Sequence, residues 1–283
     1  MFLLFISTNR RMLLLNPALR KFIYPFLLPN GLLCGLVLVL LGQDLFPTQL
    51  LPFLKVFPYV VVATGLLLGW RFNRTRLICA ILLLLLVDIY FSYLTEIKPV
   101  GLAFQIAALL LPLNLLLISW FRERGLLNFR IVFWGLFLLV QLSGSVWLIK
   151  GFPVQGLHYL TYPLIHHLKE IPLALGQPVL LANLLVLLLF GVRFICRFAA
   201  FEVSFFWAQI LLFAGFLGWG EQPLRFFLAS AGLVLILGIM ETSHSLAYRD
   251  ELTGLPGRRA LNEALAKLGN KYTFAMLDID HFK

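Results

Sequence analysis

The sequence predicts an all-α integral membrane helix bundle of about eight transmembrane helices, followed by a short α/β segment. Two observations predict the bundle. Of the 283 residues, 61% are hydrophobic and only 13% are charged, whereas soluble domains carry roughly 25% charged residues. Apolar runs also recur between short charged stretches, and about 20 apolar residues cross a hydrocarbon core of ~30 Å. A change of composition after residue 240 predicts the separate tail.

The apolar runs predict where the helices lie. We place the spans at 22–41, 56–70, 77–94, 100–120, 131–149, 173–192, 203–219 and 226–240. Pro29 with Asn30 interrupts the first run and Pro112 the fourth, and we expect kinks there, because helices in a bundle re-satisfy freed backbone groups. Residues 1–240 therefore form a multi-pass membrane domain.

The net charge of +10 raises the alternatives of nucleic acid and anionic lipid as partners. The charge is sorted by loop, however: one set of alternate loops carries twelve Lys and Arg and the other carries five. The positive-inside rule places the richer set in the cytoplasm. We therefore expect the amino terminus and the tail to be cytoplasmic, with membrane lipid and no nucleic acid as a partner.

Polar residues within the spans are candidates for a sensing site, since they are costly in a bilayer. Asp88 and Gln141 lie deep in their spans, and Gln105 and Asn183 lie in the outer halves of theirs. Together they could line a pocket, which makes Asp88 and Gln141 the candidates for intramembrane sensing. The alternative is interhelical hydrogen bonding that holds the bundle together, which is common for Gln and Asn.

The predicted outer connection at 150–172 contains three histidines, His158, His166 and His167. Metal or haem sensing is one hypothesis. The spacing of these histidines matches no recognised ligand set, and Tyr and His beside apolar residues are typical of an interfacial helix. We favour the interfacial helix.

The last span is expected to continue out of the membrane as a signalling helix over 241–249. An alternating spacing of four and three predicts the seam of a two-stranded coiled coil. The residues of this seam are Leu233, Leu237, Met240, His244 and Ala247. The alternative is one edge of an ordinary helix, with His244 in solvent.

Residues 250–283 read as a small alternating unit. Gly254 and Pro256 mark a turn, the apolar residues of 260–268 repeat as one helix face does, and 272–277 suits a buried strand. The strand would end at Asp278 and Asp280. Carboxylates at a strand end can ligate Mg²⁺, and the alternative is a pair of solvated or helix-capping acids.

Two motifs carry a resemblance to a known family. The turn reads DELTGLPGRR at 250–259, and the strand end reads DIDHFK at 278–283. This segment resembles the start of the GGDEF family of nucleotidyl cyclases. The resemblance implies the first helix and strand of an α/β GGDEF domain at 250–283, and a membrane-bound sensor diguanylate cyclase of the bacterial inner membrane. Such an enzyme makes cyclic di-GMP from two GTP and works as a homodimer, here paired through the signalling helix.

The resemblance also implies roles for single residues. Asp278 would be catalytic and would bind Mg²⁺ (or Mn²⁺) through its carboxylate, and Ile279 through its carbonyl. The backbone at His281 and Phe282 would approach the GTP phosphates, and Lys283 would bind them. Gly257 stands where the family usually has Asn, which predicts a modest cost in local stability.

The GG(D/E)EF motif itself does not occur in these 283 residues. We therefore expect the chain to be a fragment that is inactive alone, and the intact protein to be the enzyme. The alternative function is a non-catalytic multi-pass membrane protein, similar to a receptor or transporter, with a decayed cyclase tail.

Overall fold

A computed structural model describes residues 29–42, 51–94, 100–121, 123, 129–164, 174–197, 200–217, 221–250, 253, 255–268 and 272–273. Over these residues the chain forms helices joined by short connections. They are α2 (Asn30–Gly42), α3 (Leu51–Arg71), α4 (Thr75–Leu94), α5 (Val100–Ser119), α6 (Phe129–Gly151), α7 (Pro153–Leu160), α8 (Gln177–Arg197), α9 (Ala200–Phe216), α10 (Glu221–Tyr248) and α11 (Arg258–Ala266).

Five of the described helices are long and apolar enough to span a membrane: α4, α5, α6, α8 and α10. This agrees with a membrane protein. The expected spans at 22–41, 56–70 and 203–219 correspond instead to shorter apolar helices, so the described residues do not contain eight full-length spans. α2 begins at Asn30, directly after Pro29, where we expected only a kink. α9 has 17 residues, which at 1.5 Å each reach about 26 Å; this falls short of a ~30 Å core.

The predicted α/β segment is wrong for the part of the tail that the structure describes. The predicted helix is present as α11, but every regular element described is a helix, and β-type pairing there is one isolated bridge between Arg249 and Pro256. Tyr272 and Thr273, the first residues of the predicted strand, are not in a strand. A strand needs a neighbouring strand for its backbone groups, and the described tail offers none. Residues 274–277 lie outside the described residues.

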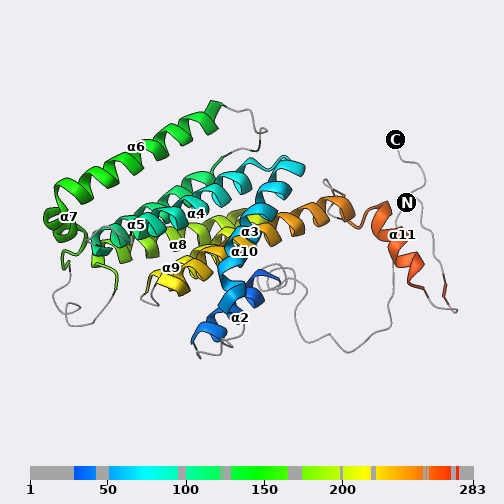
Figure 1. Ribbon diagram of the computed structural model, residues 1–283. Coiled ribbons are helices and arrows are strands. Elements are labelled where there is room, and N and C mark those ends of the chain that lie inside the picture. The colour runs from blue at the N-terminus through cyan, green and yellow to red at the C-terminus, as the bar shows by residue number, and fades with distance from the viewer. Residues whose placement is uncertain are drawn as a thin grey trace.

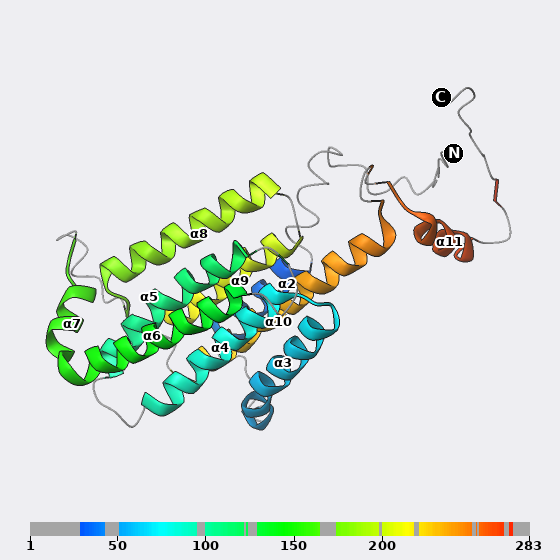
Figure 2. The same cartoon turned by 90° about the horizontal axis from the view of Figure 1, so that it is seen from above.

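α10 is the central helix of the bundle. It packs most extensively on α9 and also contacts α2, α3 and α4, and 67% of its apolar window is buried, against 17% for α6. Figures 1 and 2 show α10 leaving the bundle toward α11, and Figure 1 shows α6 at the outer edge. An apolar helix buried on most sides belongs to a core, so α10 joins the core directly to the tail.

A glycine allows α9 and α10 to approach each other closely. A Cβ built on Gly238 of α10 would lie 2.5 Å from the Cβ of Ser204 in α9, which is closer than real Cβ atoms approach. Small residues of this kind let membrane helices pack at short range. The two helices are therefore in contact at the level where α10 leaves the bundle.

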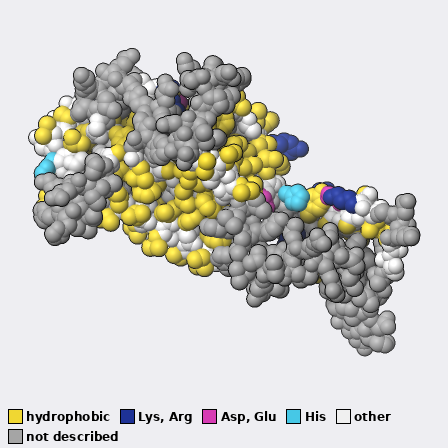
Figure 3. All heavy atoms as spheres, turned by 90° about the horizontal axis from the view of Figure 1, so that it is seen from below, with side chains coloured by type: hydrophobic (Ala, Val, Ile, Leu, Met, Phe, Trp, Pro, Cys, Tyr) yellow, Lys and Arg dark blue, Asp and Glu magenta, His cyan; other side chains and the backbone are white. Residues whose placement is uncertain are grey.

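The surface of the bundle is apolar. Figure 3 shows hydrophobic side chains covering most of the coloured bundle surface, with few charged side chains among them. Val140 is 68% exposed, Trp147 63% and Leu188 63%. Because soluble proteins rarely expose contiguous apolar patches of this extent, this surface is suited to lipid.

Candidate functional site

The residues that follow α10 form a turn stabilised by the first motif of the tail. The Asp250 carboxylate accepts hydrogen bonds from the backbone N–H and the hydroxyl of Thr253, both at 2.8 Å. The Asp250 N–H donates to the Leu255 carbonyl at 2.9 Å, and the Gly257 N–H donates to the Tyr248 carbonyl at 2.8 Å. The Asp and Thr of the DELTGL sequence thus have a defined role, which is to fold the chain back between α10 and α11.

Gly257 is the N-cap of α11 and makes no side-chain capping bond. Its φ of −78° is open to any residue, so the glycine is not required by backbone conformation. An Asn at this place could cap the helix. The position therefore has the geometry of a cap residue.

The catalytic and substrate-binding residues predicted from the resemblance are Asp278, Ile279, His281, Phe282 and Lys283. All of them lie outside the described residues. Their roles remain predictions.

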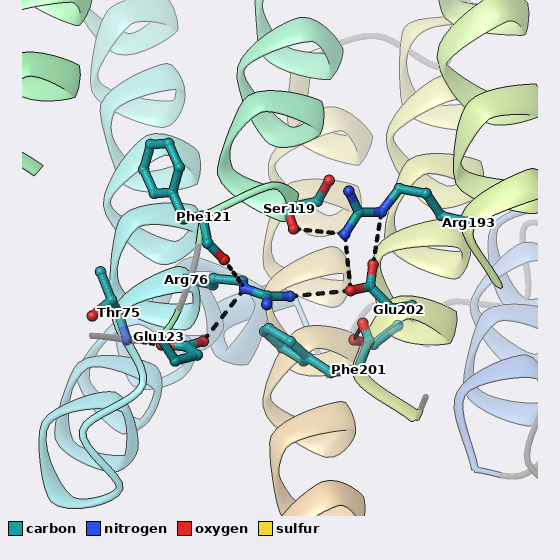
Figure 4. Close-up of polar contacts among 9 residues, drawn as sticks. Thr75, Arg76, Ser119, Phe121, Glu123, Arg193, Phe201 and Glu202 are labelled. Carbon is teal, nitrogen blue, oxygen red and sulfur yellow. Dashed lines mark hydrogen bonds and ion pairs between the residues drawn. The ribbon is translucent and has the colours of Figure 1, made fainter. Parts of the chain in front are cut away.

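A buried ionic network lies at the end of the bundle where α10 leaves it (Figure 4). Glu202, at the start of α9, is 3% exposed. Its carboxylate accepts two hydrogen bonds from Arg193 of α8, from Nε at 3.0 Å and from Nη2 at 2.9 Å, and a third from Nη1 of Arg76 at 3.1 Å. One acid thus joins α4, α8 and α9.

The network also reaches the end of α5. Arg193 donates to the Ser119 carbonyl at 2.8 Å, and Arg76 donates to the Phe121 carbonyl at 2.6 Å. Both carbonyls belong to the last turn of α5 and the residues after it, where backbone acceptors lack helical partners. The two arginines therefore bind the carboxyl end of α5 as well as Glu202.

Glu123 adds a second acid at the edge of the network. Its carboxylate lies 3.7 Å from Nε of Arg76 and accepts the Thr75 N–H at 2.8 Å. Burial raises the pKa of the Glu123 carboxyl, and the Arg76 guanidinium opposes that rise. The acid holds the amino end of α4 beside the chain that follows α5.

This network is a structural clamp, since every charged group in it faces an opposite charge or a backbone carbonyl. Charge-assisted bonds of the bidentate type are the strongest that side chains make. The sequence interpretation counted Arg76 and Arg193 only as orienting charges and did not consider Glu202. The signal was available, because Glu123 and Glu202 are acids in or beside the Arg-rich loops.

Asp88, the first candidate for sensing, is not a lone acid. Its Oδ1 lies 3.2 Å from Nε of Arg225 in α10, and Arg225 also donates to the Ser92 hydroxyl. Asp88 and Arg225 line a cavity of about 20 Å³ together with residues of α3. The pair ties α4 to the beginning of α10.

Gln141, the second candidate, lies in another cavity and does not meet Asp88. It accepts a hydrogen bond from Asn114 of α5 at 2.8 Å, and both line a cavity of about 40 Å³ between α4, α5 and α6. The structure thus divides the four polar residues instead of gathering them in one pocket.

The other two amides hold helices together. Gln105 donates to the Ala174 carbonyl at 2.8 Å and accepts the Gly176 N–H at 3.0 Å. Asn183 donates to the Ala108 carbonyl at 2.9 Å and accepts from Gln209 at 3.1 Å. The alternative of interhelical hydrogen bonding describes Asn183, whereas Gln105 joins α5 to the residues directly before α8.

Among the described residues, no group of three or more His, Cys, Asp and Glu could hold a metal ion. His158 lies in α7 with its ring against Tyr159 and Tyr162, at 6.0 and 5.9 Å. His166 and His167 lie outside the described residues.

Comparison with known proteins adds no family. No protein family, no curated protein and no solved structure matches the chain.

Proposed function

We propose that this chain is the membrane-embedded sensor part of a diguanylate cyclase of the bacterial inner membrane. The observation that carries the proposal is the continuity of α10. Its 28 residues run from the core of the bundle to Tyr248, and the DELTGLPGRR motif follows at once. A helix that is packed in the bundle at one end and joined to the cyclase-like segment at the other can transmit a change in the bundle to an enzyme.

The chemistry of the proposed enzyme belongs to the residues that follow α11. Asp278 and the Ile279 carbonyl are hard oxygen donors, which suit Mg²⁺. Lys283 and the backbone at His281 and Phe282 would bind the phosphates of GTP. Synthesis of cyclic di-GMP from two GTP needs two such domains face to face, so the protein would act as a homodimer.

The emerging part of α10 supports this pairing. Met240 is 52% exposed and Leu246 50%, and His244 stacks on Tyr248 at 4.3 Å. Leu233 still packs against the core. In the proposed dimer, the two copies of α10 meet beyond Ile239, where the helix is no longer enclosed.

The orientation of the protein follows from its charges. The clamp formed by Arg76, Arg193 and Glu202 lies at the end that the positive-inside rule places in the cytoplasm, and the Asp88–Arg225 pair lies toward the other end. The tail leaves beside the clamp. This arrangement would deliver the cyclase segment to cytoplasmic GTP.

The proposal is tested by reading the coding DNA after Lys283 in all three frames and expressing the extended product. A GG(D/E)EF motif should follow, and the extended, purified protein should convert GTP to cyclic di-GMP with Mg²⁺. The 283-residue chain alone should form none. An extended chain that has the motif and folds, yet makes no cyclic di-GMP, would count against the proposal.

A further inference from the structure

The cavity between α4, α5 and α6 has an apolar wall and one polar corner. Nine of the described residues that line it are aliphatic. The four others are Tyr90, Asn114, Gln141 and Ser145, and none of the described lining residues is charged. A space of this composition inside a bundle suits a neutral molecule that is mostly apolar.

Asn114 presents an unused hydrogen-bond acceptor in this cavity. The residue is 1% exposed, and its amide nitrogen donates to the Leu110 carbonyl at 2.9 Å and to Oε1 of Gln141 at 2.8 Å. Because the Leu110 carbonyl can only accept, the nitrogen must face it. The carbonyl oxygen of Asn114 then finds no donor among the described groups.

Such an acceptor specifies the ligand's polar group. A buried acceptor without a donor is unfavourable, and a hydroxyl hydrogen would satisfy it. The absence of charged side chains from the described lining disfavours an ion, since a buried charge needs a partner. The matching ligand has an apolar chain and one neutral donor.

The cavity is placed beside lipid. Only 17% of the apolar window of α6 is buried, and Figure 1 shows α6 at the edge of the bundle. On α6, Leu138 and Leu142 line the cavity, while Leu139 and Val140 are 62% and 68% exposed. A molecule dissolved in the bilayer could therefore reach the cavity at α6.

We infer that this cavity binds the hydroxyl end of a membrane-dissolved amphiphile, with its hydroxyl on the Asn114 carbonyl, its first carbons against the apolar wall and the rest of its chain in the lipid along α6. The inference rests on the proposed sensor function only where ligand binding is interpreted as a signal to the enzyme. Binding would alter the contact of α6 with α5. α5 packs on α4, and α4 packs on α10. Gln141 contributes to this site by accepting the hydrogen bond that orients the Asn114 amide.

The test uses the 283-residue chain in vesicles of phosphatidylethanolamine and phosphatidylglycerol, so that no cyclase activity is involved. A diazirine-bearing octanol is photolysed in the vesicles, and the labelled peptides are mapped by mass spectrometry. Labelling should concentrate on α4, α5 and α6 around Asn114. Dodecan-1-ol should suppress it at least fivefold and dodecane should not, because dodecane lacks the donor.

Three variants separate this site from general partitioning into the bundle. Asn114→Leu removes the acceptor, and Leu142→Trp fills the cavity while leaving the amide pair in place. Leu139→Trp adds the same bulk on the lipid-facing side of α6 and is the matched control. Labelling of the Asn114→Leu and Leu142→Trp chains should fall at least fivefold. Labelling of the Leu139→Trp chain should equal that of the parent chain.

The outcomes decide between the alternatives. Parental labelling in a folded Asn114→Leu or Leu142→Trp chain would overturn the inference, as would equal competition by dodecane. If Asn114→Leu does not fold, Leu142→Trp decides alone. Competition by water-soluble butan-1-ol as strong as that by dodecan-1-ol, at equal concentration in the membrane, would overturn the membrane source of the ligand.

Discussion

Arg193 of α8 and Glu202 of α9 face each other in a two-pronged ion pair, with Nε 3.0 Å from Oε2 and Nη2 2.9 Å from Oε1. The two residues are nine positions apart in sequence, on consecutive helices. Arg76 completes the arrangement from α4. Because α9 packs on α10 more than any other helix does, this pair fixes the position of the helix that supports the output helix.

Glu202→Gln should destabilise the bundle, because it leaves the Arg193 guanidinium without its anion and leaves Arg76 with Glu123 alone, at 3.7 Å. Removing one partner of a buried ion pair typically costs about 3–5 kcal/mol, and we expect the lower end here, since the Arg side chains remain 12–15% exposed. Thermal unfolding of the purified chain in detergent measures the loss.

Glu263→Gln on α11 is the matched control for this substitution. Glu263 also pairs with a cation, Lys267, but both side chains are exposed, and exposed i,i+4 pairs contribute little to stability. If both variants unfold alike, the clamp does not stabilise the bundle.

Gly238→Ala should separate α9 from α10, because the added Cβ would meet Ser204 at 2.5 Å. Overpacking of this kind typically costs about 1–3 kcal/mol. Gly144→Ala on α6 is the control: nothing lies within 4 Å of its Cβ, and Ala is favoured over Gly in a helix by about 1 kcal/mol. Gly238→Ala should lower the unfolding temperature and Gly144→Ala should raise it. An unchanged unfolding temperature for Gly238→Ala would show that the two helices are not in contact at this position.

Hydropathy predicted where the apolar helices lie, but it did not predict that only five of those described qualify as spans, or which helices contact each other. Asp88 stands out in the sequence as an acid in an apolar span, but its partner Arg225 is 137 positions away and lies between the predicted spans 203–219 and 226–240. Gln141 was found in the same way, while Asn114, which completes its cavity, was not considered. Contacts between distant helices depend on packing, which periodicity does not report.

The tail shows the same division between local and distant signals. The helix periodicity of 260–268 is local and predicted α11. The strand at 272–277 was predicted from apolar β-type residues alone, and a strand depends on a partner elsewhere in the chain. The close approach of Gly238 to Ser204 could not be predicted either, because no local sequence pattern around either residue indicates a contact with the other helix.

The orientation of the chain predicts where a reporter will be active. A reporter fused after Arg249 should be active only in the cytoplasm, and one inserted near Gly156 in α7 only outside, because the Arg-rich loops stay inside. Activity of both fusions on the same side would contradict the proposed orientation. The comparison also tests the number of crossings, because the two sides on which the reporters are active depend on whether α2, α3 and α9 cross the membrane.

The phase of α10 predicts how insertions act in an extended, active protein. One residue inserted after Thr242 rotates the following helix by about 100°, whereas seven residues nearly restore the seam. Regulation of cyclic di-GMP synthesis should be lost with one inserted residue and largely kept with seven. Equal behaviour of the two insertions would show that the emerging helix is only a tether.

The most direct test of the account measures cyclic di-GMP made from GTP and Mg²⁺ by the chain extended through the GG(D/E)EF motif, with and without Asp278→Ala. The account predicts that the substitution abolishes synthesis, since it removes a metal ligand, while the unfolding temperature of the membrane bundle stays unchanged. Asn262→Ala, an exposed position on α11, is the control and should retain parental activity. Undiminished cyclic di-GMP synthesis by a folded Asp278→Ala protein would contradict the account.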